Sequence, residues 1–170
     1  EVWKKEVPIF NRMEYAGEVV KDDEIYLFFH NPDKKKNDTY NFQIMRLGYT
    51  EGRYELFSGN VPDKAHFAGF VVSGSQAFIG FTPNNRAAAL YKFDLSMKEI
   101  NPITEFTEQQ ARIEDIFTED NGGRVFAIFN VYASNTEQYL EVKEYSLQGN
   151  EIQTTQIRPG QGKKFNTARF

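Results

Sequence analysis

The sequence contains no cysteine and only two histidines, His30 and His66. Without cysteine the chain has no disulfide framework, no thiol nucleophile and no thiolate metal site. With only two histidines, a His-based metal centre or a catalytic triad is improbable. We therefore expect no metal site and no cofactor, and cysteine usage gives no information on the redox compartment.

The chain also lacks a basic excess and a long apolar run. Its 20 Lys and Arg against 24 Asp and Glu give a net charge of −4, which argues against nucleic-acid binding because such domains are basic. No apolar run approaches the roughly 20 residues that cross a bilayer, so we expect no transmembrane segment. A hydrophobic content of 40% with 15% aromatic residues is too high for a disordered chain of 170 residues.

Three similar apolar runs recur along the sequence, at residues 25–29, 77–81 and 125–129. Each run closes with a phenylalanine, and these residues, Phe29, Phe81 and Phe129, are spaced 52 and 48 positions apart. A short polar turn and another apolar patch precede each run, and the third turn contains Asn121-Gly122, a strong hairpin signal. The pattern predicts three β-hairpins.

The order of elements after each hairpin is also repeated. A variable polar loop leads to a segment in which apolar residues alternate with a period near two, and a tight turn then leads to a last short strand. Each unit therefore has four strands, with boundaries near 13–58, 65–106 and 111–157. Residues 105–116 are the one stretch that supports a helical turn, and they fall where the repeat needs a connection.

Four antiparallel strands in about 40–50 residues are the signature of a propeller blade. At the level of architecture the chain resembles the β-propeller repeat superfamily. It lacks the WD40 and kelch signatures, and its single tryptophan, Trp3, lies outside the repeats. The resemblance implies an all-β fold, a partial β-propeller of about three four-stranded antiparallel blades with half-blades at both ends.

The half-blades are predicted at residues 1–7, as the outermost strand of a preceding blade, and at 165–170, as the innermost strand of a following one. Propellers have four to eight blades, so about 3.5 blades do not close a ring. We expect residues 1–170 to form a single incomplete propeller segment, completed by further sequence or by another chain. The alternatives are an open array of three sheets and a β-sandwich with about a dozen strands.

The start of the innermost strand lies at the mouth of a propeller's central channel, where ligands commonly bind. Alignment of the repeats places Glu14, His66 and Arg112 at one equivalent position there, with Asn166 in the partial fourth repeat. A carboxylate, an imidazole and a guanidinium are suited to binding a polar small molecule or assisting proton transfer. The alternative is that these side chains only line a hydrated channel.

The predicted loops differ in charge between the two ends of the blades. Loops before the first strand and between the second and third strands carry ten basic and six acidic residues, whereas the turns at the other end carry four and eight. A basic loop face favours an acidic ligand or partner. The candidate partner-facing residues are Lys34, Lys35, Lys36, Arg86, Lys163 and Lys164. Alternatively, these are solvated loop charges that the missing blades balance.

These patterns favour a non-enzymatic propeller module for protein binding or scaffolding within a larger protein or assembly. Its partners would be another protein or the remaining blades of the ring. The first alternative is a propeller hydrolase or lyase, with Glu14 and His66 as acid and base and Arg112 as an anion clamp. The second is a carbohydrate-binding module, which needs exposed aromatic platforms. Loops rich in Asn and hydroxyl residues favour an extracytoplasmic location, in the periplasm or at the cell surface, although cytoplasmic propellers share them.

Overall fold

In a computed structural model of the chain, the described residues form twelve β-strands. The structure describes residues 6–10, 12–48, 52–61, 64–83, 87–106, 110–119, 121–134 and 137–160. The strands are β1 (Glu14–Lys21), β2 (Glu24–His30), β3 (Phe42–Gly48), β4 (Tyr54–Gly59), β5 (Ala65–Ser73), β6 (Gln76–Pro83), β7 (Ala89–Asp94), β8 (Glu99–Glu105), β9 (Gln110–Thr118), β10 (Arg124–Tyr132), β11 (Gln138–Ser146) and β12 (Glu151–Ile157).

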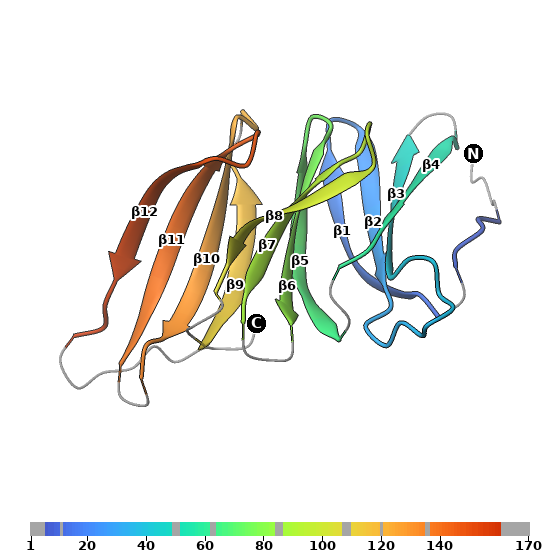
Figure 1. Ribbon diagram of the computed structural model, residues 1–170. Helices are drawn as coiled ribbons and strands as arrows, with labels where there is room; N and C mark the ends of the chain where they lie inside the picture. The colour runs from blue at the N-terminus through green and yellow to red at the C-terminus, as the bar shows by residue number, and fades with distance from the viewer. Residues whose placement is uncertain are drawn as a thin grey trace.

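The strands form three antiparallel sheets of four, each built from consecutive strands (Figure 1). We call β1–β4 blade 1, β5–β8 blade 2 and β9–β12 blade 3. Turn chemistry sets the hairpins: Asp22 and Asp23 both have positive φ angles, of 50° and 60°, between β1 and β2. Two such residues form the tight turn whose twist matches that of antiparallel strands. The end of the blades with the β1–β2, β5–β6 and β9–β10 turns is the turn end, and the opposite end is the loop end.

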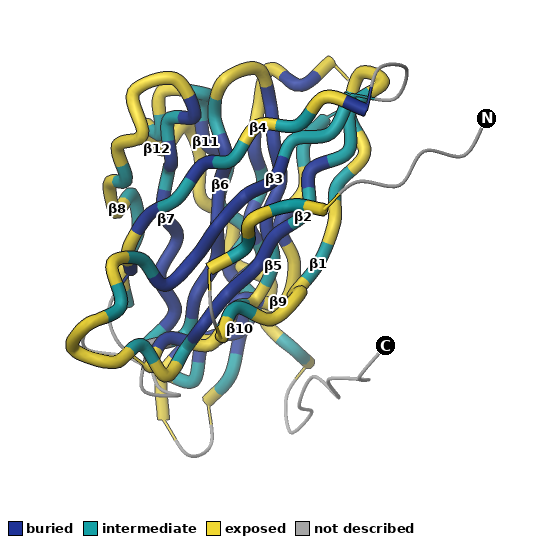
Figure 2. The backbone as a smooth tube through the Cα atoms, turned by 90° about the vertical axis from the view of Figure 1, so that its right-hand side faces the viewer, coloured by how far each residue is buried: buried dark blue, intermediate teal, exposed yellow. Residues whose placement is uncertain are grey.

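Blade 2 lies between the other two blades, and its first strand, β5, contacts both β1 and β9. Two apolar cores result, one at each junction, and they appear as buried stretches within the blades (Figure 2). The core between blades 1 and 2 includes Phe28, Phe42, Phe57, Phe70, Phe81 and Phe93. The core between blades 2 and 3 includes Val71, Phe78, Leu90, Ile113, Phe129 and Tyr145.

Alternation along the strands directs successive side chains to opposite junctions. In β5, Val72 belongs to the core shared with blade 1, while Val71 belongs to the core shared with blade 3. The repeated Phe81 and Phe129 both point toward the preceding blade. Blade 2 is therefore apolar on both faces, as expected for an internal blade.

This architecture confirms the all-β partial propeller predicted from the repeat. A two-sheet sandwich is wrong, because the strands form three separate sheets. The suggested helical turn within residues 105–116 is also wrong over the described residues, since β8 ends at Glu105 and β9 begins at Gln110. Of the predicted end strands, residues 6–7 are not in a strand, and residues 1–5 and 165–170 lie outside the described residues.

No helix in the described ranges is long and apolar enough to cross a membrane.

Candidate functional site

The innermost strand of each blade contains one β-bulge, at an equivalent place in the repeat. In each case a single residue is left without a partner across the hairpin, and these residues are Ala16, Ala68 and Glu114. The three predicted channel residues each stand two positions before the bulge: Glu14, His66 and Arg112. The backbone register therefore aligns them independently of the sequence repeat.

The three side chains are exposed near the loop end of adjacent strands. Arg112 pairs with Glu114 of its own strand, with 3.3 Å between Nη2 and Oε1. Among the residues that the structure describes, no hydrogen bond or ion pair joins Glu14, His66 and Arg112 to one another. The fourth predicted residue, Asn166, lies outside the described residues. The structure thus gives equivalent positions but no assembled acid–base cluster.

His30, which is not among the predicted site residues, lies at the junction of blades 1 and 2. His30 is buried, and its ring centroid lies 5.2 Å from that of Phe81 in blade 2. Within the described part of the chain its Nε2 atom has no hydrogen-bond partner. Burial lowers the pKa of His30 to about 4, with the nearby His66 contributing in the same direction. His30 is therefore neutral at pH 7.

The position equivalent to His30 in blade 3 is Asn130, which is fully buried. Its Nδ2 donates to Glu114 Oε1 at 2.9 Å, and its Oδ1 accepts from Gln138 Nε2 at 2.7 Å. Since Arg112 also contacts Glu114, four polar side chains form one connected network at the loop end of blade 3.

A sequence signal for His30 and Asn130 does exist, and it also marks the half-buried Thr82 of blade 2. His30, Thr82 and Asn130 each follow the closing phenylalanine of the repeated run. They pair across the hairpin with Glu14, His66 and Arg112, respectively. Each candidate channel residue therefore has a polar neighbour on the second strand.

The predicted basic loop is partly engaged in contacts of its own. Lys34 Nζ donates to Asn60 Oδ1 at 2.6 Å, and Asp38 accepts a hydrogen bond from the Lys35 backbone N–H at 2.8 Å. Lys35 and Lys36 are exposed at the loop end. The other predicted partner-facing residues, Arg86, Lys163 and Lys164, lie outside the described residues.

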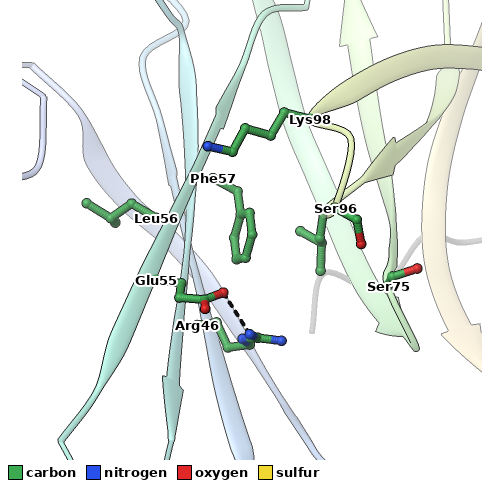
Figure 3. A pocket seen from close by; sticks show the side chains of 8 residues that line it. Arg46, Glu55, Leu56, Phe57, Ser75, Ser96 and Lys98 are labelled. Atoms are coloured by element: carbon green, nitrogen blue, oxygen red, sulfur yellow. Dashed lines mark hydrogen bonds and ion pairs between the residues drawn. The ribbon is translucent and has the colours of Figure 1, made fainter.

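A crevice of about 410 Å³ opens at the turn end between blades 1 and 2 (Figure 3). Arg46, Glu55 and Phe57 of blade 1 form one wall, and the turns of blade 2 supply Ser75, Ser96 and Lys98. No sequence signal indicated this crevice, because its walls come from two different repeats.

The described residues contain no group of three or more His, Asp or Glu side chains arranged to hold a metal ion.

Comparison with known proteins bears on the fold. No protein-family model matches the chain, and no curated protein matches it. Among solved structures, the β-propeller domain of the Trilobed protease from Pyrococcus furiosus superposes with a TM-score of 0.57 at 9% identity, over 90% of this chain and 46% of that one.

Two further structures give similar results. Acylaminoacyl peptidase from Pyrococcus horikoshii has a TM-score of 0.54 at 10% identity, over 87% of this chain and 26% of that one. A protein from Lactobacillus plantarum has a TM-score of 0.52 at 12% identity, over 86% of this chain and 42% of that one. The chain thus spans less than half the length of each of these structures.

The three sheets of consecutive antiparallel strands and the superposition on a known propeller domain agree. The described chain is a three-bladed segment of β-propeller architecture.

Proposed function

We propose that this segment is part of a larger propeller ring that acts as a non-enzymatic module for binding a protein partner. The proposal that further blades complete the ring rests on one observation: residues at equivalent positions are buried in blade 2 but exposed on the outer faces of blades 1 and 3. Val72 of blade 2 is 1% exposed against blade 1, whereas its equivalent in blade 1, Val20, is 60% exposed. Val71 of blade 2 is 9% exposed against blade 3, whereas its equivalent in blade 3, Phe117, is 40% exposed.

Both outer faces therefore present apolar side chains at the positions that an internal blade buries. On blade 3 the ring of Phe117 stacks on that of Phe126 with centroids 5.2 Å apart, which extends this apolar face over two strands. Further blades, from the same chain or from another, would cover these faces as blades 1 and 3 cover blade 2. Exposed apolar surface of this kind marks an interaction site.

Substitution of the face residues in the full-length protein tests ring completion. Val20→Lys and Phe117→Lys place a charge at a blade junction, and each is expected to lower the free energy of unfolding by about 3 kcal/mol. Met97→Lys is the matched control, because Met97 is 69% exposed on the β7–β8 turn, away from both faces. Chemical denaturation measures the effect. If all three variants are equally stable, the faces are open to solvent and the proposal is wrong.

The partner-binding part of the proposal rests on the loop end, where exposed Lys35 and Lys36 project beside the blades. A cluster of basic side chains steers an acidic partner through long-range attraction. Polyglutamate serves as a probe: Lys35→Glu combined with Lys36→Glu should weaken its binding, while Lys21→Glu at the turn end should not. Equal binding by both variants would place the acidic partner elsewhere.

The second candidate is a polar-ligand or hydrolytic site at the channel mouth, which the equivalent placement of Glu14, His66 and Arg112 supports. His66→Ala separates the two candidates. If the channel mouth is a hydrolytic site with His66 as its base, this variant loses hydrolytic activity. If the segment binds an acidic protein through Lys35 and Lys36, the variant binds polyglutamate as the parent protein does. For a carbohydrate platform the loop end offers the aromatic pair of Phe10, which is 44% exposed, and Tyr40, whose ring centroids lie 5.7 Å apart. The exposed Tyr15 and Phe117 lie on blade faces instead.

A further inference from the structure

The two blade junctions differ at equivalent positions near the turn end. In blade 2, Lys92 pairs with Phe78 across the sheet, and in blade 1, Arg46 pairs with Tyr26 in the same register. Lys92 reaches across its junction, and its Nζ donates to the backbone carbonyl of Gln148 in blade 3 at 2.8 Å. The cation of blade 2 therefore bridges to the next blade.

The rest of the junction between blades 2 and 3 is also filled. Ile103 packs so closely on Gly149 that a Cβ atom there would lie 2.8 Å from Ile103 Cγ2. Leu147 and Ile103 both pack against the core of this junction. No space for a ligand remains between the Ile103 side chain and the turn of blade 3.

Arg46 does not make the equivalent bridge. Its guanidinium turns to its own blade, 2.7 Å from Glu55 and 3.6 Å from Glu24, and lies over the ring of Phe57 at 5.9 Å from the centroid. The charge of Arg46 is thus satisfied within blade 1. The crevice between blades 1 and 2 stays open as a result (Figure 3).

The opposite wall of this crevice is a turn held in a fixed shape. Asp94 Oδ1 accepts hydrogen bonds from the backbone N–H groups of Ser96 and Met97, at 2.8 and 2.9 Å. Asp94 Oδ2 accepts a third hydrogen bond, from Gln76 Nε2 at 2.7 Å. These three contacts hold the turn in place, so it presents Ser96 and Lys98 to the crevice without rearrangement.

The crevice therefore combines an apolar surface with hydroxyl groups, an ammonium group and the paired charges of Arg46 and Glu55. Phe57 and Leu95 are buried and supply the apolar part. Ser75 and Ser96 supply hydroxyl groups, and Lys98 supplies an ammonium group with no ion-pair partner among the described residues. Its volume of about 410 Å³ lies within the range of small-molecule pockets.

We propose that the crevice between blades 1 and 2 binds a small carboxylate that carries an apolar group. The apolar group would pack on Phe57 and Leu95, and the carboxylate would pair with Lys98, whose side chain extends toward blade 1 beside Phe57 (Figure 3). This site is independent of ring completion and of the loop-end partner surface.

N-acetyl-leucine and its uncharged counterpart N-acetyl-leucinamide are the probes, titrated into the full-length protein at pH 7. Backbone amide shifts in NMR spectra report both affinity and location. The carboxylate is expected to bind at least tenfold more tightly than the amide, with the largest shifts at residues 95–98. Equal affinities, shifts confined to other regions, or no binding at millimolar concentrations would overturn the proposal.

Three variants locate the contacts. Lys98→Met keeps an unbranched side chain one atom shorter and removes its charge. It should weaken the binding of N-acetyl-leucine about tenfold without changing the binding of the amide. Ser96→Trp fills the crevice and should abolish binding of both probes. Lys36→Met removes another exposed cation, at the loop end, and should change neither affinity. Unaltered binding by Lys98→Met would exclude this site.

Discussion

The imidazole ring of His30 in blade 1 lies 5.2 Å from the ring of Phe81 in blade 2, inside the apolar junction between the two blades. The ring of Phe28 is a second aromatic neighbour, with centroids 6.4 Å apart. A titratable group is therefore part of the packing that joins two blades.

Protonation of His30 is expected to destabilise the fold. A histidine in the unfolded chain takes up a proton near its ordinary pKa of 6.5, whereas burial lowers the pKa of His30 to about 4. Between these values the unfolded state binds more protons, so the free energy of unfolding falls as the pH falls from 6.5 toward 4. The maximum loss is about 3 kcal/mol, since one pKa unit corresponds to about 1.4 kcal/mol.

Urea denaturation at pH 7.5 and pH 4.5 measures this loss. His30→Phe should have a smaller difference between the two pH values than the parent protein, because the phenyl ring does not titrate. His66→Phe is the control for the exposed histidine and should keep most of the pH dependence. An unchanged pH dependence in His30→Phe would show that other groups cause it.

Gly80 permits close packing of blade 2 on blade 3. A Cβ atom at this position would lie 2.7 Å from the Cδ1 atoms of both Ile113 and Ile116. Gly80→Ala is therefore expected to lower the free energy of unfolding by about 1–3 kcal/mol through overpacking. Gly48→Ala is the matched strand control, since a Cβ atom at Gly48 would meet no neighbouring atom within 4 Å. Adding Ile116→Val to Gly80→Ala should restore part of the loss in urea denaturation.

Asn41 takes the place of a strand partner for Val61. Its Oδ1 accepts from the Val61 N–H and its Nδ2 donates to the Val61 carbonyl, both at 3.0 Å, and the side chain is fully buried. Asn41→Ala leaves two buried backbone groups unpaired and should cost about 2–4 kcal/mol in thermal or chemical unfolding. Asn37→Ala, at an exposed position of the same loop, should cost less than about 0.5 kcal/mol.

Tyr145 ties blade 3 to blade 2 through a hydroxyl contact of 2.5 Å with Thr104 Oγ1. Burial raises the pKa of this phenol, so it stays protonated and can donate at any pH at which the protein is handled. Tyr145→Phe should lower the free energy of unfolding, measured in urea, by about 1–2 kcal/mol, because the Thr104 hydroxyl loses its partner. An unchanged free energy of unfolding in Tyr145→Phe would show that this contact does not hold the two blades together.

The strand pattern and the repeat were readable in the sequence because both depend on local periodicity. The closing phenylalanines Phe29, Phe81 and Phe129 lie in the second strand of each blade, as the spacing predicts. The repeat also aligns Glu14, His66 and Arg112 with one another. In the structure each of them stands two residues before the β-bulge of its strand, which gives the same alignment. These features depend only on residues within one hairpin, so they can be predicted from the sequence.

The contacts between blades required the tertiary structure. His30 packs on Phe81 from a different repeat, and no periodic signal links them. The open crevice depends on whether a cation pairs within its own blade, as Arg46 does with Glu55, or with the next one, as Lys92 does with Gln148. The blades themselves could be predicted from the amino-acid order, because alternation and turn chemistry act over a few residues. The junctions could not, because side-chain packing between sheets joins residues that lie far apart in the chain.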